Sequence, residues 1–204
     1  AISKDYLSIN KKQKWITTNS SRKIGNFLRS KYDCILSTSK TINYDNPLLN
    51  CRIEGLEHKS PAVIIVDRSF KIKKNLKIFR DKTRKIFIFT QMNKNIKEKY
   101  FKQIGVNIIK LKKNKNFEND IFEVYLHLKK LGFNRVLIES GIEYINEVLK
   151  HDLVKNFHLF KTSFKLRNDG KNNTKPFLIK KLKTTIKNKV KINLDGDSLY
   201  KIEL

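Results

Sequence analysis

The chain has 204 residues, of which 45 are Lys or Arg and 19 are Asp or Glu, and its formal net charge is +26. No stretch approaches the ~20 apolar residues of a membrane span. The first residues contain no signal-peptide core, and neither the two Cys nor the four His have the spacing of metal ligands. We therefore expect a cytoplasmic, metal-free protein that forms a single domain over residues 1–204.

The strongly basic composition raises the hypothesis of nucleic-acid binding. Only eight of the basic residues are Arg, the residue that makes bidentate contacts with phosphate and guanine. A broad bias toward Lys explains the charge as well, and a phosphorylated small ligand would be attracted by the same field. A basic nucleic-acid-binding module is therefore kept only as the alternative function.

Apolar periodicity predicts helices and strands that alternate over the first 150 residues. A polar, irregular segment is expected over 37–51, because Asn46-Pro47 is a turn signal. Strands are predicted at 32–36, 61–66, 85–89, 106–109 and 135–138, and helices at 19–31, 95–104, 117–130 and 143–149.

The C-terminal part has a different pattern. A strand is predicted over 154–162, and alternating apolar residues on both sides of Asp195-Gly196 predict a hairpin over 190–202. The whole order predicts an α/β fold with a central, mostly parallel sheet, an antiparallel C-terminal edge and helices on both faces. Ligands of such sheets bind beyond the carboxyl ends of the strands.

Several residues at predicted strand ends are suited to binding a phosphorylated ligand. The hydroxyl groups of 37–41 can bond phosphate or ribose, and Asp45 can act as a hydrogen-bond partner or proton donor. Gly141 would let backbone N–H groups approach a phosphate at a helix start, and Glu139 would face the cleft. A solvated polar loop and an ordinary strand-to-helix turn are the alternatives for these two segments.

Several segments, in order, resemble the reductase domain of the bacterial bifunctional riboflavin biosynthesis protein RibD. Thr41–Arg52 (TINYDNPLLNCR) matches the family pattern T-V-x-x-D-x-P-x-L-x-x-R position for position. Four residues depart from the family pattern: Tyr6 replaces a Gly, Gln13 a Ser, Ser140 a Gly, and Arg68 a Ser or Thr. Further similar segments are Ala1–Asp5, Lys14–Thr17, Asp33–Leu36, Pro61–Asp67, Ile138–Gly141 and Leu153–Leu159.

The resemblance implies a dihydrofolate-reductase-like fold and the NADPH-dependent reduction of 5-amino-6-(5-phosphoribosylamino)uracil, by hydride transfer to C1′ of the ring-opened sugar. Asp45 would be the catalytic residue that polarises the sugar, and Arg68 would contact the 2′-phosphate of NADPH. Implied substrate contacts are Gln13, Arg29, Leu49, Arg52 and Glu139. Implied cofactor contacts are Ala1, Trp15, Thr41, Asp45, Arg68, Ser69, Gly141, Ile142 and Glu143.

The resemblance also implies partners. The family carries a zinc deaminase with an HxE…PCxxC signature, which this sequence lacks, so we expect a deaminase upstream or on another protein. Ala1 would lie inside the family's first strand, and a homodimer is possible by analogy. Two alternatives stay open: a reductase of the same fold that acts on the diaminopyrimidine before deamination, and a non-catalytic relative.

Overall fold

The computed structural model describes all residues except 94–95, 115, 172–175, 186–187 and 204. The described residues form two compact units. The sheet unit comprises 26–141, and the terminal unit comprises 1–25 together with 142–204. One division falls inside α1 (Asn19–Arg29), and the other falls directly before α5 (Ile142–Lys150). The single domain predicted over the whole chain stays a prediction.

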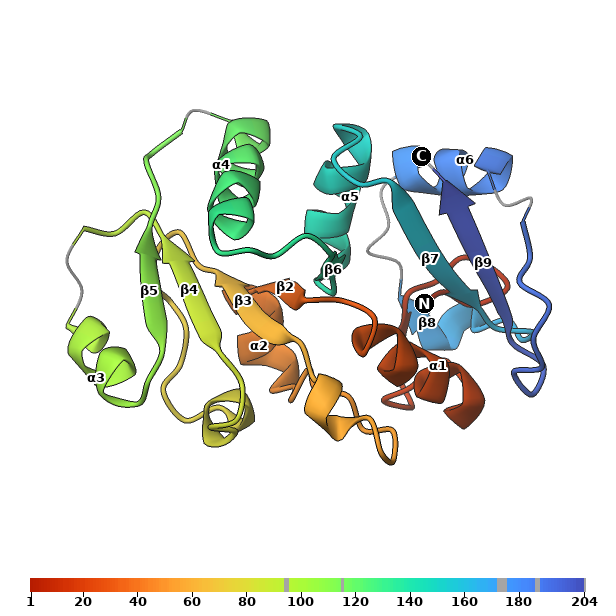
Figure 1. Cartoon of the computed structure of the whole chain (residues 1–204). Helices are drawn as coiled ribbons and strands as arrows, with labels where there is room; N and C mark the ends of the chain where they lie inside the picture. The colour runs from red at the N-terminus through yellow and green to blue at the C-terminus, as the bar shows by residue number, and fades with distance from the viewer. Residues whose placement is uncertain (94–95, 115, 172–175, 186–187, 204) are drawn as a thin grey trace. The chain divides into compact units, whose positions relative to one another are not determined.

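The sheet unit is built on five parallel strands in the order β5-β4-β3-β2-β6 (Figure 1). In the register of the sheet, Cys34 lies between Ala62 and Val136. The central strands are runs of apolar residues because both of their faces are covered. The predicted parallel sheet is thus confirmed. The strands are β2 (Cys34–Thr38), β3 (Ala62–Val66), β4 (Ile86–Thr90), β5 (Asn107–Lys110) and β6 (Val136–Ile138).

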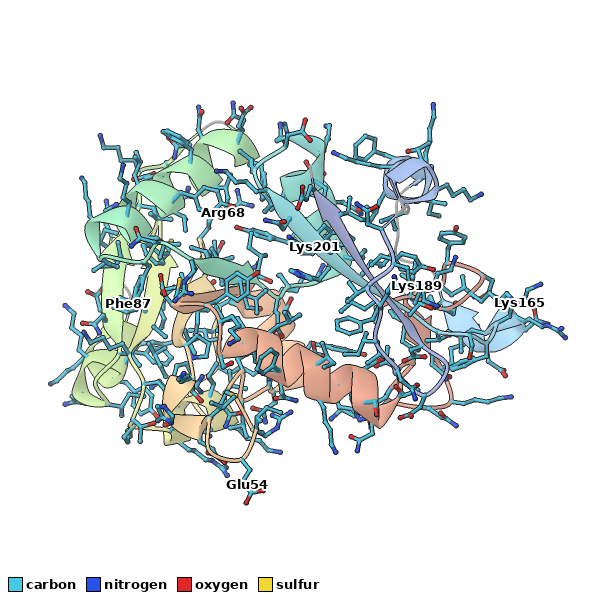
Figure 2. All side chains as sticks on the ribbon, turned by 45° about the vertical axis from the view of Figure 1, so that its right-hand side comes forward. Glu54, Arg68, Phe87, Lys165, Lys189 and Lys201 are labelled. Carbon is cyan, nitrogen blue, oxygen red and sulfur yellow. The ribbon has the colours of Figure 1, made fainter. Side chains whose placement is uncertain are left out.

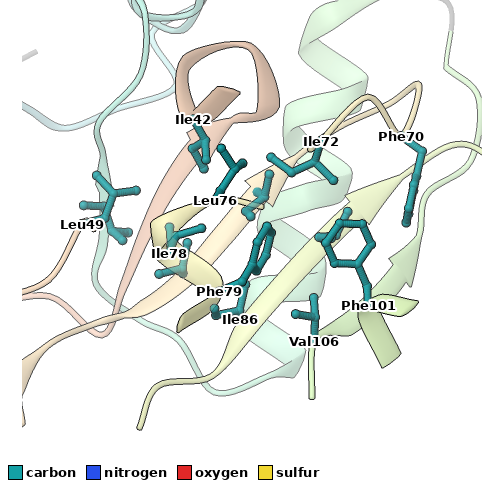
Figure 3. Packing of buried hydrophobic residues seen from close by; sticks show 14 residues of the cluster. Ile42, Leu49, Phe70, Ile72, Leu76, Ile78, Phe79, Ile86, Phe101 and Val106 are labelled. Carbon is teal, nitrogen blue, oxygen red and sulfur yellow. The ribbon is translucent and has the colours of Figure 1, made fainter. Parts of the chain in front are cut away.

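Helices cover both faces of this sheet, as predicted. On one face, Ile42, Ile78 and Phe101 join the buried cluster drawn in Figure 3. They belong to α2 (Ser39–Asp45), η2 (Lys77–Arg80) and α3 (Lys97–Gln103). On the other face, the ring of His127 in α4 (Phe117–Lys130) lies 6.0 Å from that of Phe89 in β4. A short 3₁₀ helix, η1 (Glu57–Lys59), precedes β3.

The terminal unit is built on antiparallel strands. Here β7 (Asn156–Lys161) pairs with β9 (Ser198–Glu203), and β1 (Ile9–Asn10) pairs with β8 (Gly170–Lys171). Leu159 and Ile202 pack with Leu149 of α5 and Leu178 of α6 (Pro176–Thr185). The antiparallel C-terminal strands are therefore confirmed. The remaining element is η3 (Arg167–Asp169).

Three local predictions are corrected. Residues 39–45, expected to be irregular, form α2, because Thr38 caps its start and Asn46 ends it in the left-handed region at φ 45°. The first arm of the hairpin is reduced to an isolated antiparallel bridge between Lys189 and Tyr200, beside which Val190 N donates to the Leu199 oxygen, whereas β9 pairs along its whole length with β7. The opening strand is reduced to one bridge between Ile2 and Lys161.

The surface is dominated by long polar side chains, many of them lysines such as Lys165, Lys189 and Lys201 (Figure 2). Among the described residues, no helix has the length and apolarity needed to cross a membrane.

Candidate functional site

A cluster of hydroxyl groups lies where β2 and β6 end. These strands are neighbours in the sheet, so the segments after them meet. The Thr38 hydroxyl lies 3.0 Å from that of Thr41 and 3.1 Å from that of Ser140, and the Thr41 and Ser140 hydroxyls are 3.3 Å apart. We call Thr38, Thr41, Ser140 and Gly141 the strand-end cluster. Its hydroxyl groups can turn to donate to phosphate oxygens.

Within this cluster, Gly141 packs closely against Thr41. Its N–H donates to Thr41 Oγ1 at 2.9 Å, and a Cβ at this position would lie 3.3 Å from the same oxygen. The structure thus brings together Thr41 and Gly141, two predicted cofactor contacts. Asp45, the predicted catalytic residue, is exposed at the end of α2 and lies one helical turn after Thr41.

Arg29 and Glu139, two predicted substrate contacts, form a two-pronged ion pair. Arg29 Nε and NH2 donate to the two carboxylate oxygens of Glu139, each at 2.8 Å. Arg29 NH1 also donates to the Asn50 carbonyl at 3.0 Å and to Asn26 Oδ1 at 3.3 Å. Although burial alone would lower the pKa of Arg29, the hydrogen bonds and charge of Glu139 raise it. Four of the five guanidinium N–H groups are therefore engaged.

Arg52 is exposed beside this pair and has a single weak contact, at 3.3 Å, to Asn50 Oδ1. Partial burial and the positive charge of Arg29 lower the pKa of Arg52. Two cations therefore lie close enough to repel each other. Such a pair is a favourable place for a doubly charged anion.

The segment 46–52, here called the 46–52 turn, carries Leu49 and Arg52 and has no helix or strand of its own. Hydrogen bonds and one buried side chain nevertheless hold the turn along its length. Asn46 Oδ1 accepts from Lys77 N at 2.8 Å, and Cys51 N donates to Ser60 Oγ at 3.0 Å. The Leu49 side chain is 4% exposed and packs in the core of the sheet unit.

Sequence reasoning missed Arg84, which also holds this turn. Its side chain is 3% exposed, pairs with Asp81 at 2.7 Å, and donates to the Leu48 and Leu49 carbonyls at 2.7 and 3.0 Å. The only hint in the sequence is an acidic residue three positions before an Arg that lies two positions before an apolar run.

Arg68, a predicted cofactor contact, lies beyond the carboxyl end of β3 (Figure 2). Its side chain is 55% exposed, and NH1 donates to Asp120 Oδ2 of α4 at 2.7 Å. Gln91 Nε2 donates to the other oxygen of that carboxylate, also at 2.7 Å. Asp67, buried beneath, accepts from Ile72 N and fixes the turn that exposes Arg68 and Ser69. Asp120 and Gln91 were not predicted from the sequence.

The other predicted contacts belong to the terminal unit: Ala1, Gln13, Trp15, Ile142 and Glu143. Trp15 is 53% exposed, with Lys14 Nζ and Arg22 Cζ at 5.2 and 5.4 Å from its ring centre. Gln13 is exposed, and its backbone N–H donates to Asn10 Oδ1 at 3.2 Å. The two units are described separately, so the roles of these residues stay predictions.

Tyr6 stands where the family pattern has a Gly, and it adopts φ 65°. This left-handed conformation is the one that favours Gly. The turn keeps its shape because Ser3 Oγ accepts from Leu7 N, and Asp5 accepts from the backbone of Leu166 and Arg167. Burial raises the pKa of Asp5, but a hydrogen bond from the Ser3 hydroxyl and those from the backbone of Arg167 and Leu166 lower it to about 2. Among the described residues, no group of three His, Cys, Asp or Glu side chains gathers as a metal site.

The fold and the candidate site define an α/β protein. Its candidate ligand contacts lie at the ends of strands and on the 46–52 turn. Residues 8–191 match the family model of the RibD C-terminal domain, and the chain belongs to that family. The resemblance drawn from the sequence is thereby confirmed.

The relatives agree with this assignment. The chain is 29% identical over 164 residues to the riboflavin biosynthesis protein RibD of Buchnera aphidicola from Baizongia pistaciae, covering 74% of this chain and 42% of that protein. It is 30% identical over 139 residues to a 5-amino-6-(5-phosphoribosylamino)uracil reductase of Buchnera aphidicola from Acyrthosiphon pisum, covering 63% of this chain and 64% of that protein. The chain thus spans less than two thirds of either relative.

A solved structure supports the fold. The RibD structure of Acinetobacter baumannii has a TM-score of 0.76 to this chain at 16% identity, covering 100% of this chain and 56% of that one. The fold predicted from the resemblance is therefore confirmed.

Proposed function

We propose that this chain is an NADPH-dependent reductase of riboflavin biosynthesis, which converts 5-amino-6-(5-phosphoribosylamino)uracil into its ribitylamino product. Membership of the RibD C-terminal domain family supports the proposal, as does the similarity to a relative named for this reaction. The reductase names also favour a nicotinamide cofactor in general, and NADPH is the specific form that we propose.

The observation that carries the proposal is that Arg29 and Arg52 both contact Asn50 of the 46–52 turn. A phosphate beside both cations would relieve the repulsion that, together with partial burial, lowers the pKa of Arg52. Because four N–H groups of Arg29 are already engaged, we assign the main phosphate contact to Arg52. Arg29 and Glu139 would then orient the turn and the sugar, while the backbone of Leu49 would contribute one N–H donor.

The described residues fit a dinucleotide cofactor at the carboxyl ends of the strands. Three hydroxyl groups and a close-packed Gly lie together in the strand-end cluster, which suits phosphate oxygens. Arg68 is exposed at the end of the neighbouring strand β3, where it can bind the 2′-phosphate that distinguishes NADPH from NADH. In the terminal unit, we propose Ala1, Gln13, Trp15, Ile142 and Glu143 as further contacts.

In the proposed reaction, the bound dihydronicotinamide supplies a hydride to C1′ of the ring-opened sugar. The protein contributes position and polarity. The arginines hold the phosphate end, which fixes the distance of the reacting carbon and removes the entropy of finding it. Asp45 polarises the opened sugar. Replacing Asp45 with Asn should then lower kcat while leaving NADPH binding intact, and unchanged activity would contradict this role.

The direct test mixes the purified protein with NADPH and the phosphoribosylamino-pyrimidine and follows the nicotinamide absorbance. A steady loss of absorbance is expected. No turnover, together with no binding of NADPH in calorimetry, would refute the proposal. A parallel assay with the diaminopyrimidine compares kcat/KM for the two substrates, and a higher value there would move the activity to the step before deamination. A deaminase partner and a homodimer stay predictions.

A further inference from the structure

Arg84 is the most completely enclosed arginine that contacts the candidate site, yet it belongs to neither predicted ligand set. It lies just before β4, and its side chain is 3% exposed. One guanidinium group donates to two consecutive carbonyls, those of Leu48 and Leu49, and to Asp81. A buried arginine with three such partners is held in one orientation.

These bonds determine which way the neighbouring N–H groups point. In a trans peptide, the carbonyl of one residue and the N–H of the next point in opposite directions, and the described chain has no cis peptide. Because the Leu48 and Leu49 carbonyls both face Arg84, the N–H groups of Leu49 and Asn50 both face away from it. Leu49 has φ 53°, in the left-handed region. Successive N–H groups around such a residue form a concave anion-binding nest.

The next peptide is fixed as well. The Asn50 carbonyl accepts from Arg29, and the N–H of Cys51 donates to Ser60. The side chain of Leu49 is anchored in the core (Figure 3). The turn therefore cannot rotate its peptide planes without breaking a buried contact.

We propose that Arg84 is a positioning residue, which holds the N–H groups of Leu49 and Asn50 toward the substrate phosphate by binding the carbonyls behind them. This inference rests on the proposed function for the identity of the ligand. It assigns to Arg84 no contact with substrate or cofactor. The role requires a planar fork, since a single ammonium group cannot hold two carbonyls in the same fixed geometry.

The kinetic test compares Arg84→Lys and Arg84→Met with Arg80→Met, a matched control at an exposed arginine of η2. We expect Arg84→Lys to raise the KM for the pyrimidine about tenfold, with kcat and the KM for NADPH changed less than about twofold. Arg84→Met should act more strongly in the same direction. Equal loss toward both ligands would indicate a merely structural role and would overturn the proposal, as would an unchanged KM for the pyrimidine.

A binding measurement keeps this inference separable from the proposed reaction. Ribose 5-phosphate is titrated into ¹⁵N-labelled protein, with ribose as the uncharged control. We expect saturable shifts of the Leu49 and Asn50 amide signals with the phosphate only, and in folded Arg84→Lys these shifts should need about tenfold more ligand. If these shifts occur in a protein that reduces no pyrimidine, the proposed function fails and the role of Arg84 stands. If wild type and Arg84→Lys bind equally well, the role of Arg84 is refuted.

Discussion

Arginine is used differently on the two sides of the candidate site. On the proposed substrate side, Arg29 and Arg84 are 15% and 3% exposed, and both bind main-chain carbonyls of the 46–52 turn. On the proposed cofactor side, Arg68 is 55% exposed and is held through the side chain of Asp120.

The two sides differ in how easily the contacts of each arginine can be broken. The carbonyls of the turn move only with the backbone, so the substrate side is preorganised, and its loss should lower kcat/KM for the pyrimidine. The pair of Arg68 and Asp120 can open by rotation of the Arg68 side chain, which is 55% exposed, while Gln91 still donates to the buried Asp120 carboxylate. Substitutions on the cofactor side should therefore change the preference between NADPH and NADH more readily than they change the activity.

The largest effect is expected for Arg29→Met. Glu139 would lose its two-pronged partner and the Asn50 carbonyl its donor, and breaking such a half-buried, charge-assisted pair costs about 2–3 kcal/mol. We expect kcat/KM to fall about 100-fold, together with a lower Tm. Steady-state kinetics and thermal unfolding measure both, with Arg135→Met, at an exposed ion pair with Asp33, as the control. If this variant kept a nearly normal kcat/KM, the proposed difference between the substrate side and the cofactor side would be contradicted.

A smaller effect is expected for Arg68→Ala. Losing a charge-assisted contact should raise the KM for NADPH about tenfold or more. NADH should be used as well as before or better, because the freed Asp120 can accept from a ribose 2′-hydroxyl. The measured quantity is the ratio of kcat/KM for the two cofactors, with Arg80→Met as the control. An unchanged ratio would exclude Arg68 from the 2′-phosphate site.

The strand-end cluster should respond more weakly. In Gly141→Ala, the new Cβ would lie 3.3 Å from Thr41 Oγ1, so the hydroxyl must shift. We expect the Kd for NADPH to rise a few-fold, measured by calorimetry. Gly25→Ala in α1 is a matched control, because a Cβ there meets nothing within 4 Å. It should leave the Kd unchanged and stabilise the helix by about 0.5–1 kcal/mol, and equal Kd values in both variants would argue against a cofactor contact at Gly141.

The smallest difference between the two sides is expected in how their KM values respond to salt. Screening acts on exposed charges over about 10 Å at 0.1 M ionic strength and much less on buried ones. Raising the ionic strength should therefore increase the KM for NADPH slightly more steeply than that for the pyrimidine, because Arg68 is exposed, whereas Arg52 is the one exposed arginine of the three on the substrate side. This effect adds to a general slowing expected from the +26 charge. Equal slopes would show that exposure does not distinguish the two sides.

Much of the sheet unit was predictable, because its signals are local. The apolar run of β3 and the helical periodicity of α4, predicted over 117–130 and observed as Phe117–Lys130, each lie within one segment. The helix α2 was missed, since only Ile42 and Ser39 of its seven residues are buried and its polar sequence has the composition of a loop.

The support of the site was not predictable in the same way. Arg84 contacts carbonyls 35 and 36 residues earlier in the chain, and main-chain acceptors have no sequence signature. Arg68 was predicted, but its partner Asp120 lies on α4, 52 residues away, and Gln91, which donates to the same carboxylate, directly follows β4. Motif matching identifies groups that would face a ligand, whereas the groups behind them depend on tertiary contacts.

The exposure of Trp15 has a practical consequence. It is the only tryptophan of the chain, it is half exposed, and two cations flank its ring. The indole fluorescence of this protein therefore originates from one position with a polarisable, charged environment. Because a dihydronicotinamide absorbs where tryptophan emits, quenching of this single emitter would report cofactor binding optically, without a label and without turnover.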